Sequence, residues 1–247
     1  MFEKRAIAFL DVLGFKELIS DAERDAAGFS RLVSLKTVIE SHVRYDNAGV
    51  SPDVPVDMHP KYLFVSDSII LSAPLTRGQY DGLNVIVVKA IQIAQKVVEL
   101  GHLIRGGISV GPIWHEDRNI FGSGYIEAFF TEEGAVHPRI QLAAGAAEMW
   151  KRPERAVPKL CIDDSGSLVV DILHAGYYRT NNSGITMEQY IEPLRVFIEN
   201  NLSDLPLGSE PRSKWEWMAG FYNCALKRHG LGNKPFETLP IPGGNLE

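Results

Sequence analysis

Short apolar runs bounded by glycine or turn residues mark the strands that we expect in the first part of the chain. The run at 6–15 predicts a buried strand that ends in a tight turn. Residues 61–73 hold two apolar strands around a central Asp67, which predicts a hairpin with this acid at its tip. A third strand is expected at 103–111, and residues 112–121 should return beside it as its partner.

Apolar residues that recur at three- and four-residue spacings predict the helices. We expect helical structure at 14–22 and again at 29–43. Residues 81–100 predict a longer helix that is apolar on most of its surface, so it should be buried on more than one side. Packing of the sheet on one side and of a second subunit on the other would explain this. Two further helices are expected at 122–135 and 139–150.

The order of these elements predicts the fold class. It is strand, helices, hairpin, helix, hairpin, helix, with a proline- and glycine-bearing loop at 45–60. This order is typical of a ferredoxin-like α/β sandwich, an α+β layer rather than an alternating parallel sheet. We therefore predict that residues 1–150 form one α+β catalytic domain of the kind seen in palm-like enzymes.

The C-terminal part of the chain follows a different pattern. It predicts short strands at 159–162 and 168–172, and amphipathic helices at 185–201 and 214–226. The last helix is rich in tryptophan and is expected to serve as core or dimer contact. We find no repeat or low-complexity linker, so residues 151–247 should be a strand-and-helix extension packed on the same core. Its last ~15 residues should form a loose tail.

Composition narrows the classes of function. A net charge of −6 and a pI near 5.7 argue against a surface that coats nucleic acid, which needs clustered Lys and Arg. The two cysteines, Cys161 and Cys224, form no CxxC pattern, which argues against a zinc ribbon and suits a reducing compartment. No apolar run approaches the ~20 residues of a membrane span, and the first strand leaves no room for a signal peptide. We expect a cytoplasmic protein without direct membrane contact.

Two acids at strand ends are the candidate chemical groups. A carboxylate at the end of a buried strand costs free energy unless a positive charge meets it. Asp11 and Asp67 together would suit two divalent ions, because Mg²⁺ and Mn²⁺ favour carboxylate oxygens and leave other positions to water and phosphate. The following turn, with Leu13, Gly14 and Phe15, would offer backbone N–H groups at a helix N-terminus to a triphosphate. The alternative is that the two acids only cap a helix and a turn.

The stretch AFLDVLGF, followed by a hairpin that carries SDS, resembles the class III nucleotidyl cyclase catalytic domain. The first motif of that family is Phe-x-Asp-[Ile/Val]-x-Gly-Phe, and its second metal-binding acid lies in the following hairpin. Within the family, the sequence most resembles the bacterial pyrimidine cyclases of the Pycsar anti-phage system. The resemblance covers residues 4 to about 140 and implies that Asp11, Asp67 and the backbone carbonyl of Val12 hold two Mn²⁺ or Mg²⁺ ions.

The resemblance also implies a reaction and partners. The 3′-hydroxyl of a nucleoside triphosphate would attack its own α-phosphorus, and pyrophosphate would leave. The family forms its sites between two protomers, so the resemblance implies a homodimer with sites at the subunit interface. The cyclic product would activate a separate effector protein during phage infection.

Two positions indicate which nucleotide base the site would recognise. Adenylate cyclases read adenine with a Lys four residues before the second metal acid and an Asp in the later hairpin. Leu63 and Asn119 stand at the matching positions, and the Glu and Cys that guanylate cyclases use there are absent too. Loss of such a hydrogen-bonding set can cost several orders of magnitude in discrimination. We therefore expect a uridylate cyclase that makes 3′,5′-cyclic UMP, with CTP as the close alternative substrate and a purine cyclase left open.

The source of a catalytic cation is a second departure from the family. Class III enzymes usually carry Asn-x-x-x-Arg on the helix after that hairpin, but Ile126 and Phe130 stand there. Either another arginine, namely Arg105, Arg118 or Arg139, serves the nucleotide site, from this chain or its partner, or the activity is weak. For Arg105 a bracing role inside the sheet is the stronger interpretation. The alternative function is a degenerate nucleotide-binding domain that regulates a partner.

Overall fold

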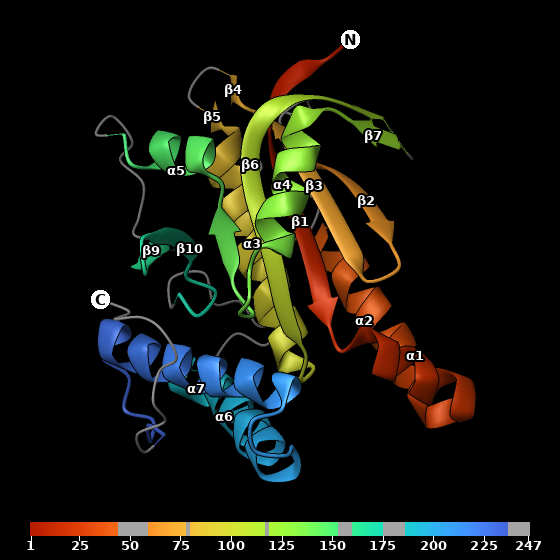
Figure 1. The fold of residues 1–247 in the computed structure, drawn as a ribbon, viewed down its shortest axis with the longest axis vertical. Coiled ribbons are helices and arrows are strands. Elements are labelled where there is room, and N and C mark those ends of the chain that lie inside the picture. The colour runs from red at the N-terminus through yellow and green to blue at the C-terminus, as the bar shows by residue number, and fades with distance from the viewer. Residues whose placement is uncertain (44–58, 78–79, 117–118, 153–159, 175–185, 237–247) are drawn as a thin grey trace.

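The central strand of the fold is β1 (Glu3–Leu13), which pairs with β3 on one side and β6 on the other. The computed structural model describes residues 1–43, 59–77, 80–116, 119–152, 160–174 and 186–236. One eight-stranded sheet runs in the order β2-β3-β1-β6-β8-β10-β9, with β7 paired to β6 (Figure 1). Its other strands are β2 (Lys61–Val65), β3 (Ser68–Pro74), β6 (Leu103–Glu116), β7 (Asn119–Phe121), β8 (Ile140–Leu142), β9 (Cys161–Asp164) and β10 (Ser167–Val170).

Helices connect and cover these strands. They are α1 (Phe15–Arg24), α2 (Ala26–Val43), α3 (Gly82–Glu99), α4 (Ser123–Glu133), α5 (Ala144–Trp150), α6 (Met187–Asp204) and α7 (Glu210–His229). In the row β2-β3-β1-β6 each strand is antiparallel to the next, and α1-α2 and α3 form the two crossovers. This is the ferredoxin-like arrangement, so the predicted α+β fold is confirmed. Among the helices of the described ranges, none has the length and apolarity that a membrane crossing requires.

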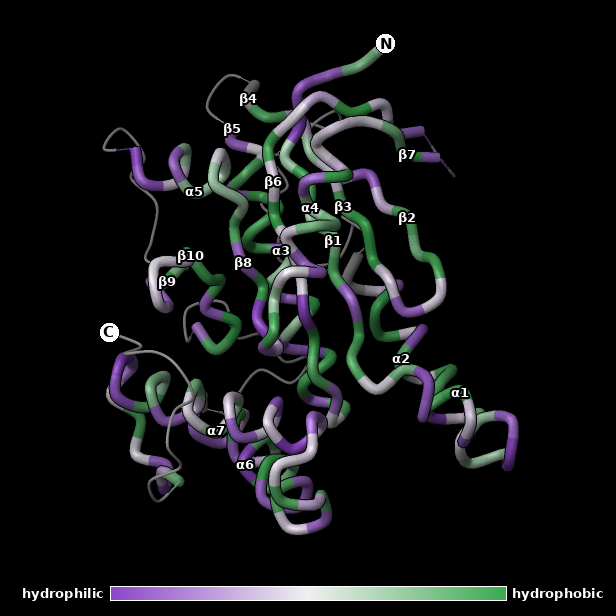
Figure 2. The backbone as a smooth tube through the Cα atoms, viewed as in Figure 1, coloured by the Kyte–Doolittle hydropathy of each residue, from purple (hydrophilic) through white to green (hydrophobic). Residues whose placement is uncertain are grey.

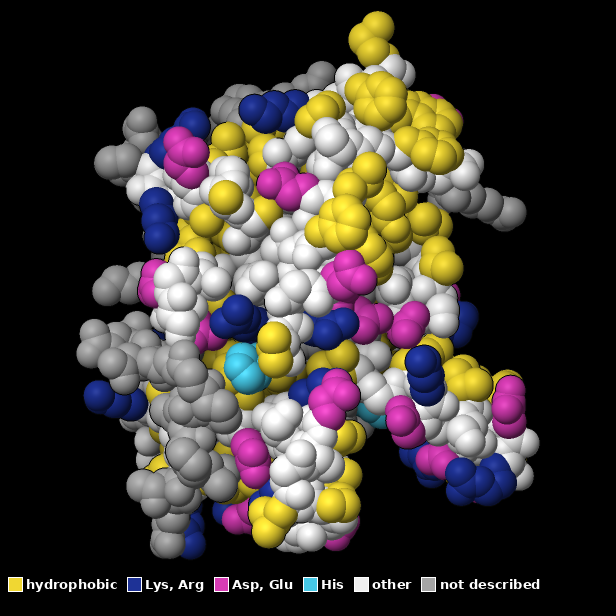
Figure 3. All heavy atoms as spheres, in the orientation of Figure 1, with side chains coloured by type: hydrophobic (Ala, Val, Ile, Leu, Met, Phe, Trp, Pro, Cys, Tyr) yellow, Lys and Arg dark blue, Asp and Glu magenta, His cyan; other side chains and the backbone are white. Residues whose placement is uncertain are grey.

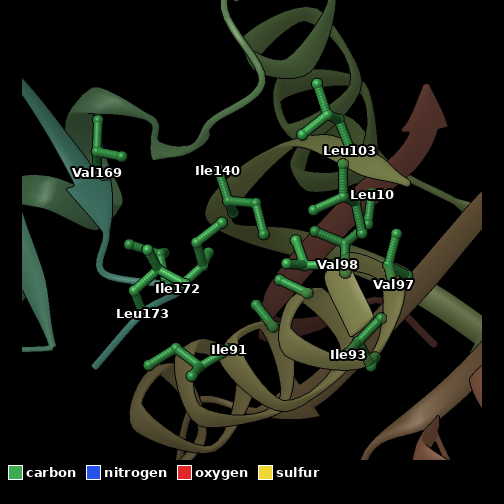
Figure 4. Close-up of a cluster of buried hydrophobic side chains, with 14 of the residues drawn as sticks. Leu10, Ile91, Ile93, Val97, Val98, Leu103, Ile140, Val169, Ile172 and Leu173 are labelled. Carbon is green, nitrogen blue, oxygen red and sulfur yellow. The ribbon is translucent and has the colours of Figure 1, made fainter. Parts of the chain in front are cut away.

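The two faces of β1 enter two hydrophobic clusters. Ala8 and Leu10 belong to the large cluster that includes α3, whereas Ile7 and Phe9 pack in a smaller cluster with α4. Figure 4 shows Leu10 among side chains from α3 and β6, and Figure 2 shows that the hydrophobic segments gather at the centre of the sheet. Side chains alternate across a strand, so Asp11, two residues after Phe9, lies on the α4 face. The candidate site is therefore on the face of the sheet that packs against α4 through the smaller hydrophobic cluster.

Helix α3 is buried within the chain, which corrects the expectation of a subunit contact on its second side. It packs on β1, β3 and β6, and it also contacts α2 and α6. The hydroxyl of Tyr190 in α6 donates to the backbone oxygen of Gln95 at 2.8 Å. The sequence could not reveal this cover, because the amphipathic face of α6 that supplies it is about 100 residues away in the chain.

Two other predictions differ from the structure. The expected helix at 139–150 is a short strand, β8, parallel to β6, and only then the helix α5. Three residues of alternating burial are too few to distinguish a strand from the start of a helix. In addition, β6 does not end at Gly111 but continues through Pro112 to Glu116, where it pairs with β7.

The structure also contains a short pair of strands, β4 (Thr76–Arg77) and β5 (Tyr80–Asp81), that we did not predict. Most of the predicted loop at 45–60 lies outside the described residues. So do Arg118 and the last part of the predicted tail, residues 237–247.

The C-terminal part extends the sheet and adds a helix pair at one end of it (Figure 1). Strands β9 and β10 form a hairpin, and β10 pairs with β8. Buried residues of α6 and α7 belong to the same hydrophobic cluster as β1 and α3. The buried carboxylate of Asp171 accepts hydrogen bonds from Arg228 and contacts His229 Nε2, each at 3.0 Å. These contacts hold the end of α7 against the sheet.

Glycines let α4 lie directly on β6. A Cβ added to Gly107 would be 2.1 Å from the backbone oxygen of Ala128, and one added to Gly111 would be 2.8 Å from the Cα of Gly124. Real Cβ atoms do not come so close, so these positions need glycine. This close packing of α4 on β6 also determines where α4 lies relative to the strand ends that carry the candidate site.

We predict that Gly107→Ala lowers the free energy of unfolding by about 2 kcal/mol, because the new methyl group overlaps backbone atoms of α4 that have no side-chain freedom. Urea unfolding followed by circular dichroism would measure this. Gly145→Ala is the matched control, since a Cβ there meets nothing within 4 Å and alanine favours helix by up to about 1 kcal/mol. Equal stability of the Gly107→Ala variant and the wild-type protein would contradict the packing described here.

Candidate active site

The two predicted metal acids lie at adjoining strand ends. Asp11 is paired in register with Ser68 of β3 on one side and Arg105 of β6 on the other. Asp67 is the second residue of the two-residue turn between β2 and β3. The backbone N–H of Val12 donates to the backbone oxygen of Asp67 at 3.1 Å. This hydrogen bond brings the hairpin tip against the end of β1, so the two acids belong to one site.

The acids create an excess of negative charge at this place. Burial and, after it, the nearby carboxylates of Glu132 and Asp67 raise the pKa of Asp11 to about 6, against the opposing effect of Arg105 and Lys214. Burial also raises the pKa of Glu132, and the neighbouring Arg105 guanidinium opposes this shift. A site that resists ionisation of its own carboxylates favours the binding of a cation.

Arg105 braces α4 against the sheet. Its Nε donates to Glu132 Oε1, and its Nη1 donates to the backbone oxygen of Ala135 at 3.2 Å. These contacts fit the bracing role that we preferred for Arg105, while its contact with a phosphate stays a prediction. The sequence analysis missed Glu132. Its spacing of four from Ala128 and eight from Gly124 on the buried face of α4 could have indicated it.

Gly14 ends β1 and begins α1. Its backbone is left-handed, with φ 79° and ψ 15°, a conformation that favours glycine. It provides no side-chain cap, and Leu18 N–H is the first of the helix to bond back, to Gly14 O at 3.2 Å. The N–H groups of the first turn, from Phe15 onward, have no partner within the helix. They stand four to six residues after Asp11, where a phosphate could accept from them.

A cleft of about 430 Å³ opens beside Asp67. It lies between the β2-β3 hairpin, β7 and α4, and both positions proposed to read the base, Leu63 and Asn119, line it. Its remaining lining residues are Phe9, Val65, Ser66, Ser68, Ile70, Ile120, Phe121 and Tyr125. The volume is in the range of small-molecule sites, and the lining is apolar with polar groups at the Asp67 end. The structure thus brings the proposed base positions and one metal acid to the same cleft.

Arg139 lies outside this cleft, directly before β8. Its Nη1 pairs with Asp164 Oδ2 at 2.5 Å, and both side chains are largely buried. The ion pair joins β8 to the C-terminal hairpin, while the contact of Arg139 with a nucleotide stays a prediction. Next to it, the ring of His137 stacks on Trp217 of α7, with centroids 5.7 Å apart.

The outer face of α4 is apolar and exposed. Ile126 and Phe130, at the positions where the family carries Asn and Arg, are 52% and 60% exposed. Figure 3 shows hydrophobic side chains over α4 and β7, with acidic side chains beside them at one end of α4.

Within the described residues, no group of three or more His, Cys, Asp or Glu side chains is arranged to hold a metal ion. A site of two carboxylates, a backbone carbonyl and substrate oxygens does not need such a group.

Comparisons with known proteins give likeness in fold only. No protein-family model matches the chain, and no curated protein matches it significantly. Among solved structures, the adenylyl cyclase CyaB from P. aeruginosa has 16% sequence identity and a TM-score of 0.49, covering 74% of this chain and 98% of its own. The catalytic core of a rhodopsin-guanylyl cyclase with converted specificity, in complex with ATPalphaS, has 13% identity and a TM-score of 0.42, covering 68% and 96%. The guanylyl cyclase Cya2 has 12% identity and a TM-score of 0.43, covering 76% and 98%.

We predict that Asp11→Asn stabilises the metal-free protein at neutral pH. The pKa of Asp11 is raised from 3.8 to about 6, so its ionisation lowers the free energy of unfolding as the pH rises through this window. The variant should therefore be more stable than wild type by about 1 kcal/mol above pH 6, a value reduced for solvent screening, and equal to it near pH 4.

Urea unfolding between pH 4 and 8 without divalent cations would measure this difference. The exposed Asp204, at the end of α6, provides the control, and Asp204→Asn should keep the wild-type profile. A wild-type protein that is more stable than Asp11→Asn at pH 7.5 would show that Asp11 has a favourable partner in the free protein.

Proposed function

We propose that this protein is a class III-type nucleotide cyclase that converts UTP to 3′,5′-cyclic UMP and pyrophosphate. The observation that carries the proposal is the meeting of Asp11 and Asp67 at adjoining strand ends, held by the Val12–Asp67 backbone hydrogen bond. The first-turn amides of α1 and the cleft beside Asp67 would complete a nucleotide site around them. The motif resemblance described above supports the same activity.

The donor set fits two divalent cations, Mn²⁺ or Mg²⁺. Asp11, Asp67 and the carbonyl of Val12 offer oxygen ligands, and the raised pKa of Asp11 indicates negative charge that lacks compensation. When bound, such ions would lower the pKa of the substrate 3′-hydroxyl and balance the charge of the triphosphate. In the reaction the 3′-oxygen forms a bond to the α-phosphorus and releases its proton. The bond from the α-phosphorus to the bridging oxygen breaks, and pyrophosphate leaves with the electron pair.

The side chains of the protein would bind and orient the nucleotide. The first-turn amides of α1 would hold phosphate oxygens, and Leu63 and Asn119 would contact the base in the cleft. An asparagine amide offers both a donor and an acceptor, so it suits uracil and cytosine alike. CTP is for this reason the close alternative substrate. A charged group that would read a purine edge is missing from both positions.

The exposed apolar face of α4 supports a homodimer with its sites at the subunit interface. Ile126, Phe130 and the nearby Phe121 are each more than half exposed, and a patch of this kind is typical of an interaction surface. By resemblance, the cyclic nucleotide would act on a separate effector protein in anti-phage defence, and the enzyme would work in the cytoplasm.

A second candidate is a degenerate cyclase domain that binds nucleotide and regulates a partner. The replacement of the family's Asn and Arg by Ile126 and Phe130 favours it. The presence of both proposed metal ligands, Asp11 and Asp67, at adjoining strand ends favours an active enzyme.

Purified protein incubated with each of the four ribonucleoside triphosphates and Mn²⁺ should produce cyclic UMP, or cyclic CMP, as measured by chromatography. Asp11→Ala and Asp67→Ala should lower this activity at least 100-fold, because each removes a ligand of the reacting centre. Activity should fall as the pH is lowered through about 6, because protonated Asp11 cannot bind a cation. Asp204→Ala should leave the rate unchanged.

The other outcomes separate the alternatives. Cyclic AMP or cyclic GMP without a cyclic pyrimidine would establish a purine cyclase. Binding of nucleotide without any cyclic product, unaffected by the Asp11 and Asp67 substitutions, would favour the regulatory domain.

A further inference from the structure

The start of α7 lies at the same end of the sheet as the last residues of β1, which include Asp11, although it comes from the C-terminal part of the chain. The ring of Trp217 stacks on His137, in the segment that follows α4. Arg105 reaches the same segment through the backbone oxygen of Ala135 at 3.2 Å. Lys214 is three residues before Trp217 and so lies on the same side of α7. In Figure 1 this end of α7 lies below the ends of β6 and α3.

Charge interactions indicate the same neighbourhood. The Lys214 ammonium lowers the pKa of Asp11, against the raising effects of burial and acidic neighbours. In return, Arg105 beside Asp11 is among the groups that lower the pKa of Glu210, in the first turn of α7, after Lys214 itself. The first turn of α7 therefore lies close enough to Asp11 and Arg105 for their charges to interact.

Two other basic side chains at this end of the sheet are already engaged. Arg105 is bound to Glu132 and to the Ala135 carbonyl, and Arg139 is bound to Asp164. The helix positions from which the cyclase family supplies a cation hold Ile126 and Phe130. A triphosphate brings about four negative charges, and binding it needs positive groups that can turn toward it.

Lys214 meets this need. Its side chain is 22% exposed, so its stem is packed while its end reaches solvent. Its Nζ pairs at 2.9 Å with Glu210, whose side chain is 81% exposed, and a surface ion pair of this kind contributes little. An exchange of this exposed carboxylate for a multiply charged phosphate is therefore favourable, and the stem can redirect the ammonium without a change in the backbone.

We propose that Lys214 binds the polyphosphate chain of the nucleotide, so that the C-terminal extension contributes to the nucleotide site from the same chain as Asp11 and Asp67. This inference rests on the proposed cyclase function and gives it a cation that the sequence analysis did not find. Lys214 would stabilise the charge that grows on pyrophosphate as it leaves, together with the first-turn amides of α1. The extension would then be required for activity and not only for packing.

The test compares binding of pyrophosphate, UTP and UMP by calorimetry in the presence of Mg²⁺. Lys214→Gln should weaken binding of pyrophosphate and UTP about tenfold or more and leave UMP affinity nearly unchanged, because a charged hydrogen bond to the polyphosphate is lost. It should also lower kcat/KM for cyclisation by a similar factor. Lys214→Arg should recover most of both values. The matched control is Lys227→Gln, at an exposed position in the last turn of the same helix, which should behave as wild type.

The outcomes distinguish this inference from the function on which it rests. Equal pyrophosphate binding and equal cyclic product in the wild-type and Lys214→Gln proteins would overturn the role of Lys214 and leave the cyclase activity standing. Equal weakening of UMP and pyrophosphate would indicate a general structural effect and would also overturn it. Pyrophosphate binding that depends on Lys214, without cyclic product from any ribonucleotide, would support the phosphate site and contradict the cyclase. If the wild-type protein binds neither pyrophosphate nor nucleotide, both proposals fail.

Discussion

The structure depends on the hydrogen bond that joins the end of β1 to the tip of the β2-β3 hairpin, from the N–H of Val12 to the carbonyl of Asp67. Because β1 is the central strand, paired along its length with β3 and β6, this contact fixes the hairpin tip relative to the whole sheet. Two carboxylates that are 56 residues apart in sequence thereby share one place.

That concentration has a consequence for stability. Burial and neighbouring acids hold the pKa of Asp11 at about 6, so the free protein carries an unfavourable charge at neutral pH. Arg105 offsets part of it but is itself held by Glu132, and close packing of α4 on the glycines of β6 holds that pair in turn. Arrangements that oppose their own ionisation are common at functional sites, where a ligand supplies the missing charge. Under the proposed function, the site would gain its affinity for cations at the expense of the stability of the fold.

The alternation of apolar runs and periodic helices predicted the ferredoxin-like core, because most of its elements are long and strongly patterned. It also placed Asp11 and Asp67 on neighbouring strand ends, since a strand end and a hairpin tip are local features. The prediction from sequence failed where tertiary contacts decide the structure of a segment. The three residues of β8 form a strand only because β6 lies beside them, and α3 is covered by α6 of the same chain. Lys214 could not be assigned from sequence, because its position depends on how α7 docks.

The central claim is that the carboxylates of Asp11 and Asp67 bind shared cations beneath a nucleoside triphosphate. Crystals grown with Mn²⁺ and a non-hydrolysable UTP analogue, measured at the manganese absorption edge, test it directly. The account predicts anomalous peaks between these two carboxylates, with the phosphates at the first turn of α1. Manganese and nucleotide bound elsewhere, with both carboxylates free of metal, would contradict it.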